Sequence, residues 1–349
     1  MAAGATSVPG PHPSSLHERG WGARLPDRAL KWILTALAAG ILVLIAFFFV
    51  RLIVEASPAF SKFGVFGFTF TNDWDVSRNF YGALPLVVGT LITSGIALLI
   101  GVPIAVATAL FLTELCPRRL RTPLTVMVEL LAAVPSVVYG LWGFLVLAPK
   151  LKGAEHWFGS TFNFLPFVGP DVPGPNYFIA GLILAIMIIP IVSAISREVI
   201  ATVPSEHKEA ALALGATRWE SIRMAVLPYA RPGITGGAML GLGRAFGETI
   251  AVAYVIGGST TLGHSIFQQG QSLAGVIALQ FGEAQSTPLY KSSLLAAGLI
   301  LFVLTLAVNL IARQYVVRAG RVGGRSRRRP GGGAALPGIT ELEPGAGPA

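Results

Sequence analysis

Long apolar runs separated by short polar segments cover most of this chain. The first run lies at about 30–54, and five more follow at about 84–115, 124–147, 177–195, 234–256 and 294–311. A helix needs about 20 apolar residues to cross the hydrocarbon core of a bilayer. The pattern therefore predicts an all-α, polytopic membrane protein with six transmembrane helices, which together occupy residues 30–313.

The two ends of the chain do not share this pattern. Residues 1–29 are rich in Pro, Gly and Ser, and residues 314–349 are first basic and then rich in Gly and Pro. Segments of this kind bury too little apolar surface to fold alone, so we expect two disordered tails. The first apolar run lacks the short core and small-residue cleavage site of a signal peptide, and we interpret it as a transmembrane helix.

The distribution of basic residues predicts the orientation. An even number of spans puts both termini on one side, and most of the 26 Lys and Arg residues then fall on that side. The exceptions are Arg244, inside the membrane, and, on the opposite side, Arg51, Lys62, Arg78, Lys150, Lys152 and Lys291. The positive-inside rule thus predicts cytoplasmic N- and C-termini. It also explains the net charge of +9 through cytoplasmic segments and lipid headgroups, so no nucleic-acid partner is expected.

No set of catalytic residues stands out. The chain has no G-x-x-x-x-G-K-[ST] phosphate loop, and its five histidines lack the spacing of metal ligands. The single cysteine, Cys116, excludes an intrachain disulfide and any multi-cysteine metal site. We therefore expect a protein that is not an enzyme, has no cofactor or metal, and takes its energy from another subunit.

A polar elbow at about 204–228 interrupts the apolar pattern between the fourth and fifth runs. Breaker and capping residues predict two short helices joined by a left-handed C-cap at Gly215, with further boundary signals at Pro204, Ser205, Thr217, Glu220 and Pro228. Helices this short are marginal in water. The elbow is therefore either a docking element for a partner or a loop folded back on its own helices, and its residues alone favour neither reading.

The spacing of six elbow residues resembles the EAA loop of the permease subunits of bacterial ABC importers. The matching positions are Glu209, Ala210, Ala211, Gly215, Leu227 and Pro228. One position departs from that pattern, because Ala225 stands where isoleucine is usual. In those permeases the loop is the coupling helix that fits a cleft on the ATPase subunit. The resemblance thus implies that Glu209 and Gly215 lie at such a contact.

Three further segments resemble the PstC-type permeases of phosphate transporters. They are YGALPLVVGTLITS from Tyr81, PSVVYGLWG from Pro135 and GLGRAFGETIAVA from Gly241, so the resemblance covers about 81–313. It implies the type I ABC importer permease fold and import of inorganic phosphate across the bacterial cytoplasmic membrane. It also implies three partners: a second, PstA-like permease, a dimer of ATPase subunits and an extracytoplasmic phosphate-binding protein.

Arg244 and Glu248 are the charged residues of the fifth apolar run. A charge at mid-membrane costs at least about 2.5–3.5 kcal/mol, so each must be paired or hydrated. Their spacing of four puts them on one face of a continuous helix, which leaves two readings: a buried ion pair, or an aqueous path for a solute. Glycines at 236, 237, 241, 243 and 247 on the same helix permit close helix contact or exposure of the backbone to a solute.

An oxyanion is the solute that suits this pair. The planar guanidinium of Arg244 matches a tetrahedral oxyanion, and a partly protonated phosphate can donate a hydrogen bond to Glu248, which would repel sulfate. In the family that the chain resembles, the matching arginine and glutamate are implicated in transport. Two alternatives remain: a permease for sulfate, molybdate or phosphonate, and an ion-coupled secondary transporter. Copurification of an ATPase with this chain would distinguish an ABC importer from an ion-coupled secondary transporter.

Smaller features complete the predictions. Aromatic residues crowd the outward loops at 60–74 and 157–167, as an interfacial belt or a docking surface. An N-cap serine predicts a short outward helix at 272–281. Prolines 103, 135 and 190 are expected to bend their helices. Solvation at span ends accounts for Glu129, Arg197 and Glu198.

Overall fold

The computed structural model describes residues 24–164, 167–169, 174–263, 265–285 and 287–324. Eight helices form its frame, namely α1 (Arg24–Phe63), α3 (Leu84–Leu110), α4 (Arg118–Ala133), α5 (Ser136–Trp142), α6 (Ala148–Thr161), α7 (Tyr177–Ala201), α10 (Leu227–Gly247) and α13 (Pro288–Gly324). Between them lie α2 (Val65–Phe70), α8 (Ser205–Ala213), α9 (Arg218–Ser221), α11 (Ile250–Val255) and α12 (Leu273–Ala284). The described chain is therefore almost entirely helical, as predicted.

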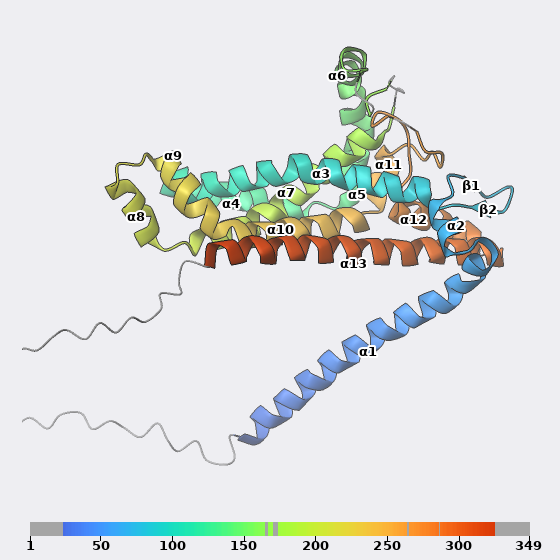
Figure 1. Ribbon diagram of the computed structural model, residues 1–349, viewed down its shortest axis with the longest axis horizontal. Helices are drawn as coiled ribbons and strands as arrows, with labels where there is room; N and C mark the ends of the chain where they lie inside the picture. Colours follow the sequence, from blue (N-terminus) through green and yellow to red (C-terminus); the bar gives the residue numbers. More distant parts are fainter. Residues whose placement is uncertain (1–23, 165–166, 170–173, 264, 286, 325–349) are drawn as a thin grey trace, which may run out of the picture.

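Three π-helical turns and one small hairpin connect these helices. The turns are η2 (Phe111–Leu115), η3 (Gly143–Leu147) and η4 (Ile222–Val226). Strands β1 (Trp74–Asp75) and β2 (Phe80–Tyr81) pair antiparallel, with Trp74 opposite Tyr81. In Figure 1, α8 and α9 lie at one end of an elongated bundle, and α2, α12 and the hairpin lie at the other end.

The bundle is built around α7, which packs against both α3 and α10. Small residues let the helices approach closely: a Cβ at Gly181 would lie 2.6 Å from Ile96, and one at Gly101 would lie 2.8 Å from Ile188. The central cluster of buried side chains comes from the inner face of α7 and includes Ile179, Ile183, Ile188 and Val192. This packing at small residues is typical of membrane helices.

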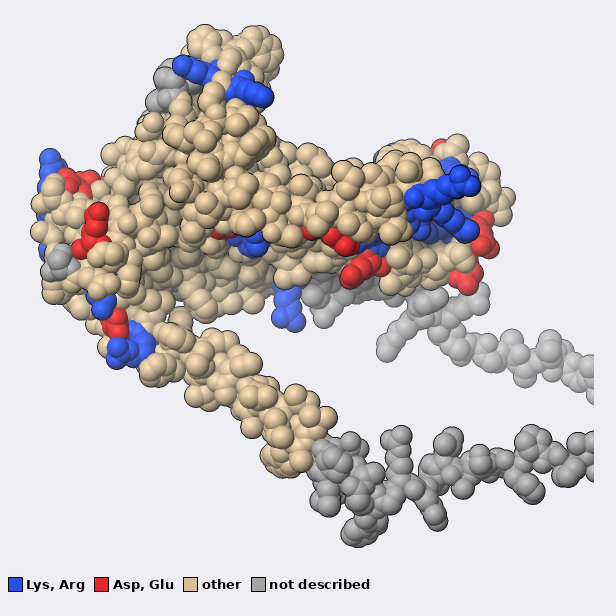
Figure 2. Space-filling model, turned by 180° about the vertical axis from the view of Figure 1, so that it is seen from behind, with Lys and Arg blue, Asp and Glu red and all other residues tan. Residues whose placement is uncertain are grey.

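Four helices are long and apolar enough to cross a membrane within the described residues: Ala29–Phe63, Leu84–Leu115, Tyr177–Ala201 and Pro288–Gln314. A bent pair, Arg118–Ala133 with Ser136–Thr161, makes up to five. Charged side chains gather mainly at the two ends of the molecule, and few interrupt the broad face between them (Figure 2). The spans are thus those of a polytopic membrane protein, whereas the number six stays a prediction.

The third predicted span, 124–147, is wrong as a single helix. The chain bends by 88° between α4 and the helix that follows. Val134 is extended (ψ 127°), and Pro135 caps α5. A proline disfavours the helical region for the residue before it, and the bend falls at this pair. Pro103 and Pro190, in contrast, stay inside α3 and α7.

The bounds of the outer helices also differ from the predicted ones. Helix α1 already begins at Arg24, within the stretch predicted as a tail, and α13 continues to Gly324, past the predicted boundary at 313. The remainder of both predicted tails lies outside the described residues. The short helix predicted at 272–281 is confirmed as α12, and its Ser272 hydroxyl accepts the Gly275 N–H at 3.0 Å.

The aromatic residues of the first outward loop divide into two groups. Phe68, Trp74 and Tyr81 are buried, and the ring of Tyr81 stacks on Tyr290 with centroids 5.5 Å apart. Phe66, in contrast, is 80% exposed. Part of the predicted belt is therefore a core that ties the hairpin to α12 and α13, and the exposed remainder stays open to lipid or a partner.

Candidate functional site

The first elbow helix ends as its sequence predicts. Gly215 has a positive φ of 86°, a conformation that favours glycine. Its N–H donates to the Leu212 carbonyl at 2.9 Å, and the Ala216 N–H donates to the Ala211 carbonyl at 3.1 Å. These two bonds are the Schellman pattern, which satisfies carbonyls left free at the end of a helix. The left-handed C-cap predicted at Gly215 is confirmed.

The second elbow helix begins with the predicted capping box. The Glu220 N–H donates to the Thr217 hydroxyl at 3.3 Å, and the Thr217 N–H donates back to the Glu220 carboxylate at 2.8 Å. The backbone hydrogen bond from Thr217 is the main reason that the pKa of Glu220 lies below its ordinary value. Two independent local signals thus define the turn between α8 and α9.

Two predicted boundaries of the elbow are wrong. Ser205 is the first residue of α8, and Pro204 occupies the N-cap position without a side-chain hydrogen bond. Pro228 does not end the second helix, because α9 continues through η4 into α10. The Leu227 N–H donates five residues back to Ile222, and this wider π register directly precedes the proline, which has no N–H of its own to contribute.

The residues of the EAA pattern lie mainly at the surface. Glu209, Ala210, Gly215 and Pro228 are exposed, whereas Ala211 and Leu227 are half-buried. A cleft of about 710 Å³ opens between α8 and the helix after it, with a mostly apolar lining of His207, Ala210, Ala211, Leu214, Gly215, Ala216, Glu220, Met224, Ala225 and Tyr229. The elbow therefore presents an open surface of the kind that a partner could cover.

Apolar side chains of the elbow fall into an outward and an inward set. Leu212, Leu214 and Trp219 are exposed by 47%, 90% and 61%. Ile222, which the sequence placed with them, is instead buried together with Val226 against the ends of α3 and α7. The inward set anchors the second half of the elbow, and the outward set remains uncovered within the described chain.

Arg244 and Glu248 do not share a continuous helix. Helix α10 ends at Gly247, and Glu248 is extended, with ψ 126°. Among the residues that the structure describes, Glu248 forms no ion pair with Arg244, and its carboxylate instead accepts the Ala251 N–H at 3.4 Å, at the start of α11. The prediction of one helical face is wrong, and the ion-pair reading loses its geometric basis.

Helices α5 and α11 meet beside this charged position. A Cβ at Gly140 of α5 would lie only 2.8 Å from the Cα of Ala251 in α11, so the two short helices touch at their backbones. Tyr139, the neighbour of Gly140, lies within electrostatic range of Arg244. Arg244 itself is exposed and Glu248 is half-buried. Two interrupted helices thus frame an arginine that this chain does not cover.

The glycines of α10 occupy two different faces. Gly237 and Gly241 press against α7, where an added Cβ would lie 3.1 Å from Ile195 and 2.8 Å from Val192, respectively. The other glycines of the predicted set, at positions 236, 243 and 247, have no atom within 4 Å of such a Cβ. Close helix contact is therefore confirmed for Gly237 and Gly241, whereas Gly236, Gly243 and Gly247 lie on an open face.

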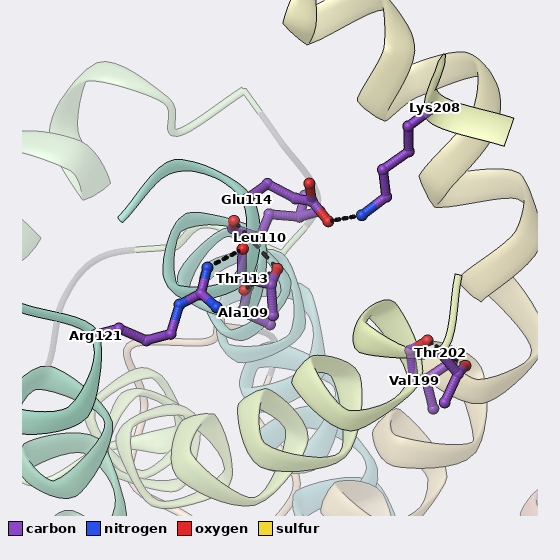
Figure 3. Close-up of polar contacts among 8 residues, drawn as sticks. All are labelled: Ala109, Leu110, Thr113, Glu114, Arg121, Val199, Thr202 and Lys208. Carbon is purple, nitrogen blue, oxygen red and sulfur yellow. Dashed lines mark hydrogen bonds and ion pairs between the residues drawn. The ribbon is translucent and has the colours of Figure 1, made fainter. Parts of the chain in front are cut away.

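Sequence reasoning missed the ion pairs between segments far apart in the chain, and two of these pairs are short. Arg197 of α7 pairs with Glu129 of α4 at 2.6 Å, so solvation at span ends is a wrong explanation for these two residues. Lys208 of α8 pairs with Glu114 of η2 at 2.5 Å (Figure 3). Separations of 68 and 94 residues leave no local pattern by which either pair could be recognised.

Comparison with known proteins adds three findings. The family model described as "Binding-protein-dependent transport system inner membrane component" matches residues 101–320. The phosphate transport system permease protein PstC of Xylella fastidiosa (strain Temecula1) is 43% identical over 300 residues, which cover 84% of this chain and 92% of that protein. The protein of the same name from Pasteurella multocida (strain Pm70) is 45% identical over 294 residues, covering 82% and 90%.

A solved structure resembles the fold. It is a crystal structure of a bacterial alginate ABC transporter in complex with an alginate pentasaccharide-bound periplasmic protein. One chain of it aligns with a TM-score of 0.57 and 20% sequence identity, and the alignment covers 84% of this chain and 96% of that chain. The likeness concerns the arrangement of helices alone.

Proposed function

The chain belongs to the family of binding-protein-dependent transport system inner membrane components, and from this we propose that it is the permease subunit of an ATP-driven importer of inorganic phosphate. The observation that carries the proposal is identity of 43–45%, over more than four fifths of the chain, to relatives named as phosphate transport permeases. The family model, which matches residues 101–320, spans the elbow and the interrupted helices, where the chemistry of transport would reside.

The partners follow from this role. The importer would combine this chain with a second, PstA-like permease, a dimer of ATPase subunits that hydrolyse ATP, and an extracytoplasmic phosphate-binding protein. The open face of α10 supports the second permease, because exposed Arg244 cannot face lipid without a cost of at least about 2.5–3.5 kcal/mol. A partner helix or a hydrated path would remove that cost.

The elbow would couple the chain to the ATPase. Glu209, Ala210 and Gly215 are exposed, whereas Ala211 and Leu227 are half-buried. Pro228, which follows Leu227, completes the pattern. The cleft of about 710 Å³ beside them is deep enough for apolar side chains of a partner. Closure of the ATPase dimer on ATP would push on this surface and tilt the helices that continue from it.

Arg244 and Glu248 would serve the phosphate path. The guanidinium can donate two parallel hydrogen bonds to phosphate oxygens. Glu248 is held at the start of α11 by the hydrogen bond from the Ala251 N–H. Its carboxylate can accept a hydrogen bond from a protonated phosphate oxygen, and it would weaken the binding of a fully ionised anion. Because Arg244 lies in α10 and Glu248 lies in the linker that is bonded to α11, a change in the angle between α10 and α11 would alter their spacing and so the affinity for phosphate.

The elbow would lie in the cytoplasm, with both termini on the same side of the membrane. Figure 1 shows the described end of α13 beside the elbow and the first residues of α1 toward that same end of the molecule. The basic residues of the elbow and of the first turn of α4, namely Arg118, Arg119 and Arg121, support this orientation through the positive-inside rule.

The experiment that tests this function is uptake of labelled phosphate by proteoliposomes that hold the complete complex. We expect uptake that needs ATP inside, needs the binding protein outside, and is not suppressed by excess sulfate or molybdate. Suppression by one of those anions would identify a permease for another oxyanion. Uptake without ATP, driven by an ion gradient, would contradict an ABC importer.

A further inference from the structure

Helix α8, the first half of the elbow, makes few contacts with the membrane helices, one of them between the rings of His207 and Tyr229 of α10, whose centroids are 5.8 Å apart. It is nine residues long and buries none of its side chains. Only Lys208 and Ala211 of this helix are half-buried, and its other residues are exposed. Because a helix of this length is marginal alone, contacts from outside must set its position relative to the bundle. Lys208 supplies one of them.

The Lys208–Glu114 pair is sheltered compared with an ordinary surface ion pair. Its Nζ and Oε1 atoms are 2.5 Å apart, and the two side chains are 28% and 17% exposed. Both residues line a small cleft of about 240 Å³ together with Leu115, Leu212, Ile222 and Val226. Arg218 and Ser221 complete the lining, and the apolar neighbours reduce the access of water to the pair, which strengthens the attraction between the two charges.

Glu114 belongs to a segment that touches two membrane helices. It lies in η2, the π turn that ends α3. Next to it, the carbonyl of Thr113 accepts a hydrogen bond from the guanidinium of Arg121 in α4, as Figure 3 shows. Lys208 thereby joins α8 to the end of α3 and, through the adjoining backbone, to α4, the first half of a broken span.

We propose that Lys208 and Glu114 form a positioning strut, which makes α8 move with η2 and so carries displacement of the elbow to α3 and α4. This inference rests on the proposed coupling function, but it assigns a role to two residues outside the EAA pattern and outside the phosphate path. Without the strut, α8 would follow the ATPase while the ends of α3 and α4 lagged behind, and ATP would be hydrolysed with little transport.

The test compares the phosphate imported with the ATP hydrolysed in proteoliposomes of the complete complex. Lys208→Gln and Glu114→Gln are each expected to lower this ratio at least about fivefold, the lower end of typical coupling between sites. The double variant should lose no more than either single one, since the same contact is removed once. Lys208→Arg, which keeps the charge, should restore most of the ratio.

Arg51→Gln serves as the matched control. It breaks the Arg51–Glu55 pair, which is equally short at 2.6 Å but more exposed, with side-chain exposures of 58% and 34%, and which lies far from the elbow in α1. Its ratio should equal that of the unaltered complex. An unchanged ratio in both Gln variants would overturn the strut, as would failure of both to assemble with the ATPase. Absence of phosphate uptake by the unaltered complex would refute the proposed function instead.

Discussion

At the scale of single residues, the position of Glu248 changes what its carboxylate can do. It sits outside α10 and accepts the N–H of Ala251, the second residue of α11, and it forms no ion pair with Arg244 within the described chain. A carboxylate in this setting can discriminate between anions that carry a proton and anions that do not. The selectivity hypothesis therefore survives the loss of the shared helical face.

Glu248→Gln tests that hypothesis directly. The amide keeps the size and an acceptor oxygen for the Ala251 N–H, so α11 should begin as before. Removal of a like charge about 4 Å from a bound anion is worth roughly 1 kcal/mol or more, so sulfate should then compete at least about fivefold better against phosphate. Competition is measured on the solubilised complex without its binding protein, so that protein cannot mask the effect.

Glu198→Gln is the control for this change. Glu198 is an exposed residue near the end of α7, away from Arg244, and its loss should leave competition by sulfate unaltered. Equal competition in the Glu248 and Glu198 variants would show that Glu248 does not select the anion.

At the scale of elements, the elbow was the most predictable part of the chain. Its C-cap at Gly215 and its capping box at Thr217 are decided by residues at most four or five positions apart, and the structure contains both. Such caps satisfy backbone groups locally, whatever surrounds them. Local chemistry of this kind is what a single sequence records best.

The breaks in the spans were less predictable, because apolar composition hides them. Pro135 interrupts its span and Pro190 does not, although both stand within apolar runs. Pro190 is buried between packed helices and Pro135 is exposed, but Pro103 is exposed as well and α3 continues through it, so burial alone does not decide whether a proline breaks a span. The break at Glu248 has no proline at all. The apolar pattern of the sequence does not distinguish these outcomes.

Gly215→Val tests the elbow as a coupling element. A β-branched residue at a positive φ costs on the order of 1–3 kcal/mol, more than a short exposed helix end can absorb. We expect the variant to insert in the membrane but to lose ATP-driven uptake. Gly215→Asn, which tolerates this conformation, should retain most of it.

Gly153→Val in α6 provides the comparison. Gly153 lies in a helix, with a φ outside the positive range and no atom within 4 Å of an added Cβ, so valine there should leave uptake near normal. Normal uptake by the Gly215 valine variant would exclude a role for this turn in coupling.

At the scale of the whole molecule, composition and periodicity predicted the class of fold, whereas the number of spans remained open. Four unbroken spans and one bent pair are evident in the described residues, and α10 with α11 would complete six if the pair crosses together. Charges inside α10 keep it from standing out as a span by hydropathy, although its place beside α7 puts it within the bundle.

A topology assay counts the spans. A reporter that is active only outside the cytoplasm should be silent when fused after Arg121 or Arg223 and active when fused after Lys152 or Gln271. The reason is that the basic segments around the first two positions stay inside. Activity of the fusion after Arg223 would contradict both the cytoplasmic elbow and the six-span arrangement.

The central claim is that phosphate passes this chain at Arg244, and ATP-driven phosphate uptake by the complex with Arg244→Ala tests it most directly. Uptake should disappear while membrane insertion and copurification of the ATPase persist, and Arg244→Lys should rescue little, since one ammonium cannot reproduce the paired donors of a guanidinium. The double variant Arg244→Leu with Glu248→Leu, which removes both charges, should be equally inactive. Near-normal uptake of phosphate by the double variant would contradict the claim.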